Sequence, residues 1–257
     1  MSKKVDLNIF VENQIGIVEI NRAPNNHFDY KLIAQIADCF MDFDKDDNCR
    51  CIVLCSDGKH FCAGANFGKD RDMQDKAAPY SALYSQAVRL FKNKKPVIAA
   101  VQGAAIGAGL RLSLVADFRI GCPESRFSAN FSRLGFHQGF GTTVTLPRVI
   151  GPQNASMMML TGRRLKGQEA FDIGLIDYLV PLKEVRSKAI ELAEEISEAG
   201  PLAVQSIRAT IRAGLAEQVE EIVSWELSEQ VRLQSTKDFK EGIKASLERR
   251  KPKFEGS

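Results

Sequence analysis

Long apolar runs are absent from this 257-residue sequence. None approaches the roughly 18 residues that a membrane-spanning helix requires, and the first ten residues, MSKKVDLNIF, lack the apolar core of a secretory signal. We therefore expect a protein of the cytoplasm with no membrane partner. A strong charge of either sign is also missing: the formal net charge is +3, which argues against nucleic acid as a partner.

Metal-binding and redox motifs are missing as well. The six cysteines include no Cys-x-x-Cys pair, and the three histidines complete no zinc-ligand spacing. We therefore expect no metal site. Cys51 and Cys55 lie within the apolar run CIVLC, so buried free thiols are the simplest interpretation of the cysteines.

The most informative stretch runs from 95 to 117, KPVIAAVQGAAIGAGLRLSLVAD. Its β-branched start predicts a buried strand over 96–101. The segment 107–109, Gly-Ala-Gly, predicts a tight loop, and the leucine spacing from Leu110 predicts a helix. Amides at the start of a helix lack backbone partners, and small residues let a ligand approach them. The junction therefore favours binding of an anion, or of an oxygen that becomes one during a reaction.

Strand and helix patterns alternate up to about residue 195. We predict strands within 8–21, 51–55, 117–122 and 175–180, and helices over 30–43, 80–91, 152–160 and 168–173. From residue 182 only helical spacing occurs, over 182–198, 201–213, 217–234 and 236–250, with Ser235 and Asp238 expected to cap the last helix. The chain thus divides into an αβ core, 1–195, and a helical region, 196–257.

Five segments, in this order, resemble the enoyl-CoA hydratase/isomerase (crotonase) family. They are 61–66 (FCAGAN), 95–103 (KPVIAAVQG), 107–109 (GAG), 160–164 (LTGRR) and 174–177 (GLID). Each is modest alone, but together they extend the resemblance over about residues 8–254. The resemblance implies an α/β fold built as a spiral of ββα units, with a C-terminal helical region that mediates trimerisation. It also implies coenzyme A thioesters as substrates, and a homotrimer or a dimer of trimers.

The resemblance further implies an oxyanion hole made by two backbone N–H groups. By motif position these belong to Ala65 and Ala108. A thioester carbonyl gains negative charge as it becomes an enolate, and each preorganised donor stabilises that charge by about 3–4 kcal/mol. We expect both alanines to act in catalysis. The resemblance assigns substrate binding to their neighbours Ala63, Gly64, Asn66, Gly107 and Gly109.

The sequence departs from the family pattern at the positions of proton transfer. Hydratases of the family carry one catalytic glutamate where this chain has Arg111, and a second where it has Phe131. Other members place an acidic residue where this chain has Gly139, beside Gln138. A guanidinium stays protonated and a phenyl ring transfers no proton. We therefore expect ordinary hydration to be weak or absent.

Two residues are candidates for replacing the lost chemistry. His137 lies in the loop that borders the acyl pocket in relatives, and its side chain titrates near neutral pH. The alternative is a histidine that hydrogen-bonds backbone and shapes this loop. Arg111 either pairs with Asp117 or another carboxylate, or attracts a carboxylate on the substrate, as in a malonyl-type thioester. An acid within the loop 68–79 is a further alternative.

Coenzyme A enters as part of the substrate, so no separate cofactor is expected. The resemblance places its adenine and pantetheine near Asn26 and the residues after Ala63. Arg22 and the basic tail 249–253 are candidates for its phosphates, and Phe254 resembles a residue that packs near the adenine. The remaining residues expected to contact substrate are Arg111, Phe131 and Gln138.

Three functions remain open on the sequence alone. The first, which we favour, is a lyase or isomerase that acts on acyl-CoA thioesters through an enolate, by decarboxylation or isomerisation. The second is a non-catalytic protein that keeps only the binding site for acyl-CoA. The third is a dinucleotide enzyme, suggested by the glycines at 103, 107 and 109. That spacing does not match G-x-G-x-x-G, and Asp117 follows too closely to bind the ribose.

Overall fold

The computed structural model of the protein describes residues 6–66 and 80–257. Within these residues the strands form a six-stranded sheet, ordered β1-β2-β3-β4-β6-β9, and a three-stranded sheet, ordered β5-β7-β8. The strands are β1 (Leu7–Glu12), β2 (Ile15–Ile20), β3 (Cys51–Ser56), β4 (Val97–Val101), β5 (Ala104–Ile106), β6 (Phe118–Gly121), β7 (Arg126–Ser128), β8 (Arg164–Lys166) and β9 (Tyr178–Leu179).

The strand predicted within 8–21 is a hairpin of two strands. β1 and β2 pair antiparallel, and Asn13 and Gln14 between them have φ values of 51° and 66°. Two successive left-handed residues form the tight turn that suits a two-residue hairpin. From β2 onward the neighbouring strands of the large sheet run parallel.

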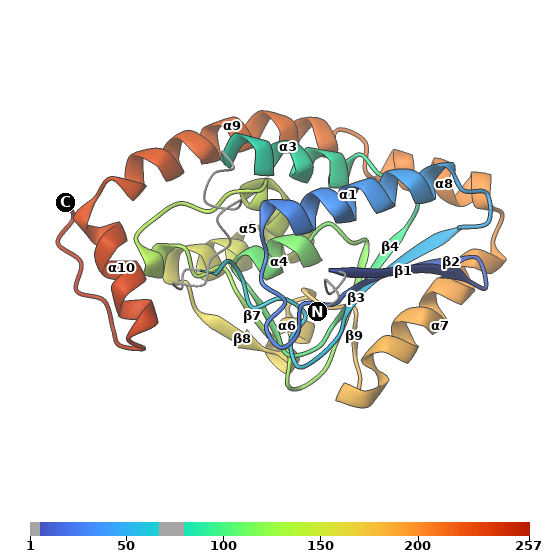
Figure 1. Cartoon of the computed structure of the whole chain (residues 1–257), viewed down its shortest axis with the longest axis horizontal. Helices are drawn as coiled ribbons and strands as arrows, with labels where there is room; N and C mark the ends of the chain where they lie inside the picture. Colours follow the sequence, from blue (N-terminus) through green and yellow to red (C-terminus); the bar gives the residue numbers. More distant parts are fainter. Residues whose placement is uncertain (1–5, 67–79) are drawn as a thin grey trace, which may run out of the picture.

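The central strands β3 and β4 of the large sheet are buried on both faces, which explains why they are apolar at successive positions. One face of β3, with Ile52 and Leu54, packs into the main core together with α1 (Tyr30–Lys45) and α3 (Tyr80–Phe91). The other face, with Val53 and Cys55, packs against α7 (Val185–Glu198). Figure 1 shows α1 and α3 on one side of the sheet and α7 on the other.

The remaining helices are α4 (Ala108–Ser113), η1 (Ser132–Leu134), α5 (Thr142–Thr161), α6 (Gly167–Asp172), η2 (Leu182–Glu184), α8 (Pro201–Ile211), α9 (Leu215–Gln234) and α10 (Lys237–Leu247). Of these, α4 and α6 contact strands of the small sheet, and the others follow β7 along the chain. The helix expected over 152–160 is the second half of α5, which bends at Gly151. α9 extends along α3, and α10 packs against η1 near the C-terminus of the chain (Figure 1).

Several local predictions can be compared with the structure. Asp29 caps α1 by accepting a hydrogen bond from the Leu32 amide at 2.7 Å. The predicted cap of the last helix is wrong: Thr236 caps α10, while Asp238 accepts hydrogen bonds from the amides of the C-terminal residues 255 and 256. All six cysteines are free and buried, as expected.

The two-part division of the chain remains a prediction. Its boundary at residue 195 falls inside α7, whose Val185 and Ala189 pack on the large sheet. Among residues 6–66 and 80–257, no helix combines the length and apolar character needed to cross a membrane.

Candidate active site

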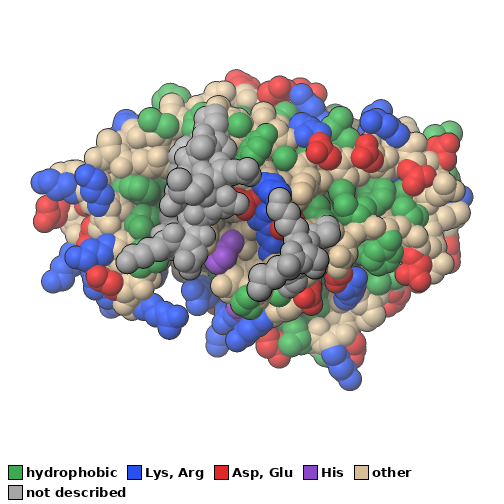
Figure 2. Space-filling model, in the orientation of Figure 1, with side chains coloured by type: hydrophobic (Ala, Val, Ile, Leu, Met, Phe, Trp, Pro, Cys, Tyr) green, Lys and Arg blue, Asp and Glu red, His purple; other side chains and the backbone are tan. Residues whose placement is uncertain are grey.

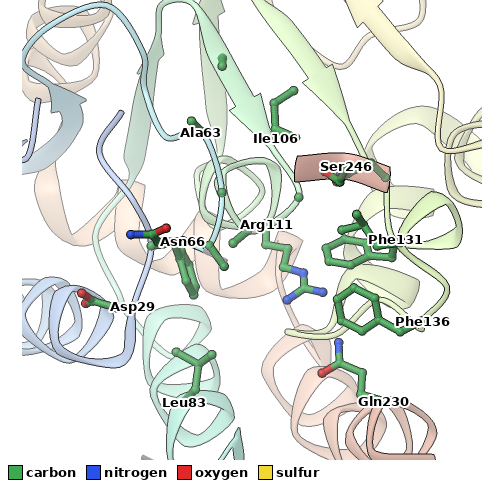
Figure 3. Close-up of a pocket in the computed structure, with 18 of the residues that line it drawn as sticks. Asp29, Ala63, Asn66, Leu83, Ile106, Arg111, Phe131, Phe136, Gln230 and Ser246 are labelled. Atoms are coloured by element: carbon green, nitrogen blue, oxygen red, sulfur yellow. The ribbon is translucent and has the colours of Figure 1, made fainter. Parts of the chain in front are cut away.

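A cavity of about 430 Å³ opens where segments distant in sequence converge (Figure 3). Residues from the turn before α1, the 63–66 segment, α3, β5 with α4, the η1 loop, α9 and α10 border it. It brings together eight of the expected site residues: Ala63, Gly64, Ala65, Asn66, Gly107, Ala108, Arg111 and Phe131.

Backbone hydrogen bonds at Cys62 hold the two expected amide donors in one place. The Cys62 amide donates to the Ala104 carbonyl at 2.9 Å, and the Cys62 carbonyl accepts from the Ile106 amide at 3.1 Å. The 62–65 segment therefore lies against β5 as a parallel partner. Ala65 follows Cys62 by three residues and Ala108 follows Ile106 by two, so both reach the same cavity.

Two glycines make this approach possible. Gly107 has a φ of +54°, a conformation that residues with a side chain rarely adopt. A Cβ at Gly109 would lie 2.0 Å from the Cys62 carbonyl oxygen, so any side chain there would push α4 away from the 62–65 segment. Glycine at positions 107 and 109 therefore allows the start of α4 to approach the 62–65 segment closely.

The amide of Ala108 is available as a donor. Ala108 is the first residue of α4 and does not have a positive φ, so alanine fits this position without backbone strain. The first amides of a helix have no intrahelical acceptor. Within the described residues, neither Ala65 nor Ala108 donates its amide to another group of the protein.

Arg111 and Phe131 lie together inside the cavity. Arg111 is only 6% exposed, and its guanidinium carbon lies 3.9 Å from the centroid of the Phe131 ring. Phe131 contacts Phe136 edge to face at 5.4 Å, and Figure 3 shows the guanidinium pointing toward these two rings. The cation–π contact with Phe131 is one interaction that stabilises this buried charge.

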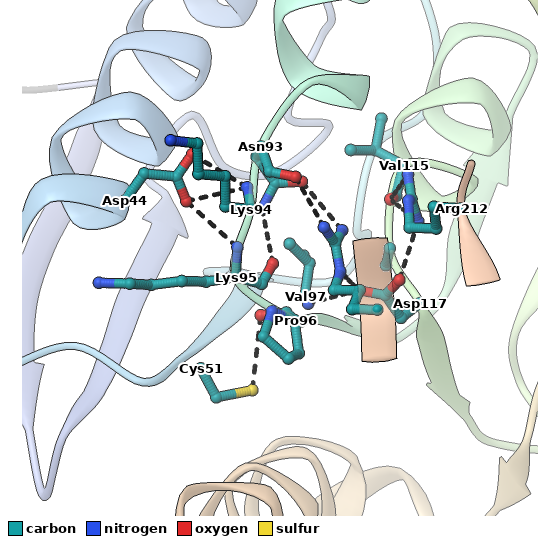
Figure 4. Close-up of polar contacts among 12 residues, drawn as sticks. Asp44, Cys51, Asn93, Lys94, Lys95, Pro96, Val97, Val115, Asp117 and Arg212 are labelled. Carbon is teal, nitrogen blue, oxygen red and sulfur yellow. Dashed lines mark hydrogen bonds and ion pairs between the residues drawn. The ribbon is translucent and has the colours of Figure 1, made fainter. Parts of the chain in front are cut away.

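The expected pairing of Arg111 with Asp117 is wrong, because other arginines use that carboxylate. Asp117 accepts from Arg208 Nε at 2.8 Å and from Arg212 Nη1 at 2.9 Å, and also from the Val97 amide. Figure 4 shows Asp117 and Arg212 of this network close to Val97, the first residue of β4. None of these residues borders the cavity. Asp117 therefore joins α8 and the residues after it to the large sheet.

The charges that border the cavity are mainly positive. The described lining contains the arginines Arg111, Arg126 and Arg164 and, among the acidic residues, Asp29. Asp29 accepts from the Leu32 amide and pairs with Arg22. Its oxygens are thus engaged in capping α1 and in an ion pair, while the arginines favour an anionic ligand.

The chain is similar to known proteins over nearly its full length. The family model described as enoyl-CoA hydratase/isomerase matches residues 11–257. The chain belongs to the enoyl-CoA hydratase/isomerase family. The crotonyl-CoA hydratase of Syntrophomonas wolfei is 32% identical, with 95% of each chain covered. The 1,2-epoxyphenylacetyl-CoA isomerase of Escherichia coli is 31% identical, with 96% of this chain and 97% of that protein covered.

Solved structures of this enzyme family have the same fold. The enoyl-CoA hydratase/isomerase of Pseudoalteromonas atlantica superimposes with a TM-score of 0.87 at 26% identity, covering 98% of this chain and all of that one. The carnitinyl-CoA hydratase of Mycobacterium avium gives 0.87 at 25% identity, covering 99% and 100%. The α/β crotonase fold expected from the sequence is thereby confirmed.

Other residues that the family resemblance suggested lie outside the lining that the described residues form. Arg22 pairs with Asp6 at 2.9 Å and with Asp29, and the hydrogen bond from Arg22 holds the pKa of Asp6 at about 2. Asn26 is fully buried and donates to the carbonyls of Asp57 and His60. Both residues therefore anchor the N-terminal turn. Gly109 does not border the cavity, but its lack of a side chain lets α4 lie close to Cys62.

The 137–138 segment also lies behind the cavity wall. His137 Nδ1 lies 2.8 Å from the Gln138 carbonyl oxygen, and the His137 carbonyl accepts from Gln230 Nε2 at 2.8 Å. The Gln138 side chain reaches Met159 on α5. These contacts agree with the alternative in which His137 hydrogen-bonds backbone and shapes its loop. A role for His137 in proton transfer stays a prediction.

The basic C-terminal tail lies apart from the cavity lining. Phe254 is 42% exposed, and Arg250 pairs with Glu241 and Glu248. Figure 2 shows lysine and arginine side chains gathered at the end of the molecule where α10 lies. The loop 68–79, a suggested source of an acid, lies outside the described residues.

Sequence reasoning missed several polar residues that border the cavity, among them Tyr84 on α3, Gln230 on α9 and Ser246 on α10. Tyr84 belongs to the apolar spacing of its helix, so the pattern marked it as core. Gln230 and Ser246 come from the C-terminal helices, and no motif links them to the site. Only the packing of α9 against α3 and of α10 against η1 brings them there.

Proposed function

We propose that this enzyme acts on acyl-CoA thioesters through an enolate whose oxygen binds the amides of Ala65 and Ala108. The observation that carries the proposal is that both amides border one cavity and lack another acceptor among the described residues. Two N–H donors that border the same cavity suit an oxygen that gains negative charge. The relatives named above act on CoA thioesters, which supports the same class of substrate here.

We further propose that hydration is not the main reaction. The positions where the family resemblance expects glutamates hold Arg111 and Phe131, in contact with each other at 3.9 Å. Asp29, the carboxylate of the described lining, is engaged by Arg22 and the Leu32 amide. Splitting water requires a free acid–base group within hydrogen-bond reach. Decarboxylation forms the enolate without a base, so the site suits decarboxylation better.

Decarboxylation fits the charge of the site. As the bond between the α-carbon and a carboxylate breaks, its electron pair moves into the enolate, which the two amides stabilise, and carbon dioxide leaves. A proton then joins the α-carbon. Arg111 supplies a positive charge inside the cavity that would attract the substrate carboxylate before it leaves. We favour this chemistry, with isomerisation as the alternative.

Coenzyme A would be part of the substrate, with no separate cofactor. We retain the expectation of a homotrimer or a dimer of trimers in the cytoplasm. Ile207 and Ile211 on α8 are 60% and 66% exposed in the single chain. Apolar side chains this exposed are typical of a surface that another subunit covers.

The proposal can be tested with two thioesters. Crotonyl-CoA and methylmalonyl-CoA are incubated with the protein, while thioester absorbance and carbon dioxide release are followed. We expect carbon dioxide release from methylmalonyl-CoA and little hydration of crotonyl-CoA. Rapid hydration of crotonyl-CoA would contradict the proposal. Tight CoA binding without turnover would favour the second candidate, a non-catalytic acyl-CoA binder, which the engaged state of Asp29 also favours.

A further inference from the structure

The space beside Gly139 is filled, although this residue has no side chain. A Cβ built on Gly139 would lie 2.0 Å from the hydroxyl oxygen of Tyr84 and 2.6 Å from its Cζ. The φ of Gly139 lies outside the left-handed range, so the backbone alone would accept a side chain. The position where other family members are expected to carry an acidic group thus holds a phenol hydroxyl that comes from α3.

A hydrogen bond fixes this hydroxyl, which belongs to a residue of the cavity lining. Tyr84 is 3% exposed and borders the cavity together with Gln230, which is 2% exposed. The hydroxyl donates a hydrogen bond to Gln230 Oε1, and Gln230 Nε2 donates to the His137 carbonyl at 2.8 Å. Three segments, α3, α9 and the 137–139 loop, therefore determine where the hydroxyl lies.

The other proton carriers near the cavity are less suitable. Asp29 is engaged by Arg22 and the Leu32 amide, and the His137 ring contacts the Gln138 carbonyl behind the cavity wall. Cys62 is fully buried, and burial raises the pKa of its thiol to about 12. Among the described residues, Tyr30 and Tyr84 both place a tyrosine on the lining, and Tyr84 is the one whose hydroxyl lies beside Gly139.

We infer that Tyr84 is a catalytic residue that donates a proton to the α-carbon of the enolate, in place of the carboxylate expected at position 139. This inference rests on the proposed function. The O–H bond of Tyr84 breaks as the C–H bond forms, and the enolate oxygen becomes the thioester carbonyl again. The phenolate then takes a proton from bulk water. In the reverse direction, the phenolate removes an α-proton.

Exchange of the α-protons of butyryl-CoA with D₂O tests this step without knowledge of the natural acyl group. The test compares the intact wild-type protein with Tyr84→Phe, which keeps the buried ring, and follows deuterium at the α-carbon by mass spectrometry. We expect exchange to fall by roughly 10²–10³-fold in Tyr84→Phe, with unchanged affinity for CoA. The wild-type rate should rise with pH, because the phenolate is the base, and Tyr84→Phe should lose this dependence.

Gln230→Met separates proton transfer from support of the loop. This variant breaks the hydrogen bond between the Tyr84 hydroxyl and residue 230 but leaves the hydroxyl. We therefore expect the exchange rate to fall by about tenfold or less. Equal losses in the two variants would show that Tyr84 acts only through Gln230 and would overturn the inference. Unchanged exchange in Tyr84→Phe would also overturn it, while leaving the proposed function intact. Tight CoA binding by the wild type without any exchange would instead overturn the proposed function, and the inference with it.

Discussion

The guanidinium of Arg111 stacks on the ring of Phe131, with 3.9 Å between the guanidinium carbon and the ring centroid. These two residues stand where the family resemblance places two glutamates that handle water. Their contact turns that part of the cavity into a cation held against an aromatic wall. The amides of Ala65 and Ala108 remain beside it. In the proposed site, two amides suited to an enolate oxygen thus lie with a positive charge, and the expected pair of carboxylates is replaced.

A double-mutant cycle on Arg111 and Phe131 should reveal their coupling. Arg111→Met and Phe131→Leu each remove one partner, and we expect the pair to couple by about 1–2 kcal/mol in urea unfolding, because the contact is shielded from water. The matched cycle is Arg212→Met with Phe91→Leu, where the separation is 5.9 Å. Its coupling should be less than half as large. A first cycle that is additive within error would contradict the assigned contact.

Asp117 should contribute strongly to stability. It receives two arginines and the Val97 amide while mostly buried, as Figure 4 shows. Asp117→Asn leaves Arg208 and Arg212 without a compensating charge, and we expect a loss of about 3–5 kcal/mol in the free energy of unfolding.

The exposed ion pair between Lys92 and Glu220, at 2.8 Å, provides the control for Asp117. Both side chains are at least half exposed, so Lys92→Met should cost less than about 1 kcal/mol. Losses of similar size in Lys92→Met and Asp117→Asn would show that burial of the Asp117 network does not determine its contribution.

Asp6 should make stability depend on pH at acidic values. The hydrogen bond from Arg22 holds the pKa of Asp6 at about 2 in the folded protein, below the value of about 3.9 that aspartate has in an unfolded chain. The resulting stabilisation, about 2 kcal/mol, is complete above pH 4 and is lost as the pH falls toward 2. Asp6→Asn should therefore be less stable than wild type at pH 6.

The stability difference between Asp6→Asn and wild type should shrink as the pH falls from 4 to 2, measured by urea unfolding at each pH. Asp47→Asn, at an exposed position on a turn, serves as the control and should show no such convergence. A constant difference for Asp6→Asn across this range would contradict the assigned ion pair.

Much of the fold follows from patterns that act locally. Apolar periodicity and an aspartate cap place α1 correctly, and the glycines at 107 and 109 mark the turn that begins α4. The strands β5, β7 and β8 have only three residues each, which is too short for alternation to show. Their pairing depends on contacts with distant segments, so the sequence predicts loops there.

In the candidate site, too, local sequence patterns do not reveal contacts between distant segments. Ala65 and Ala108 are found from motifs, because their backbone geometry depends on nearby glycines. Tyr84 and Gln230 come from helices whose spacing reflects packing, and only tertiary structure brings their side chains to the position beside Gly139. The pairing of Arg111 with Asp117 fails for a similar reason. Arg208 and Arg212 lie more than 90 residues after Asp117 in the sequence, and local patterns do not reveal that contact.

The most direct test of the central claim removes one amide donor. Ala108 is the first residue of α4, where proline is well tolerated, so Ala108→Pro removes the N–H while the helix can still form. Ala108→Gly retains the N–H and is the matched control. The rate of α-proton exchange of butyryl-CoA in D₂O should fall by roughly 10²–10³-fold in Ala108→Pro and by less than tenfold in Ala108→Gly. A folded Ala108→Pro variant that exchanges at the wild-type rate would show that the Ala108 amide does not stabilise the enolate.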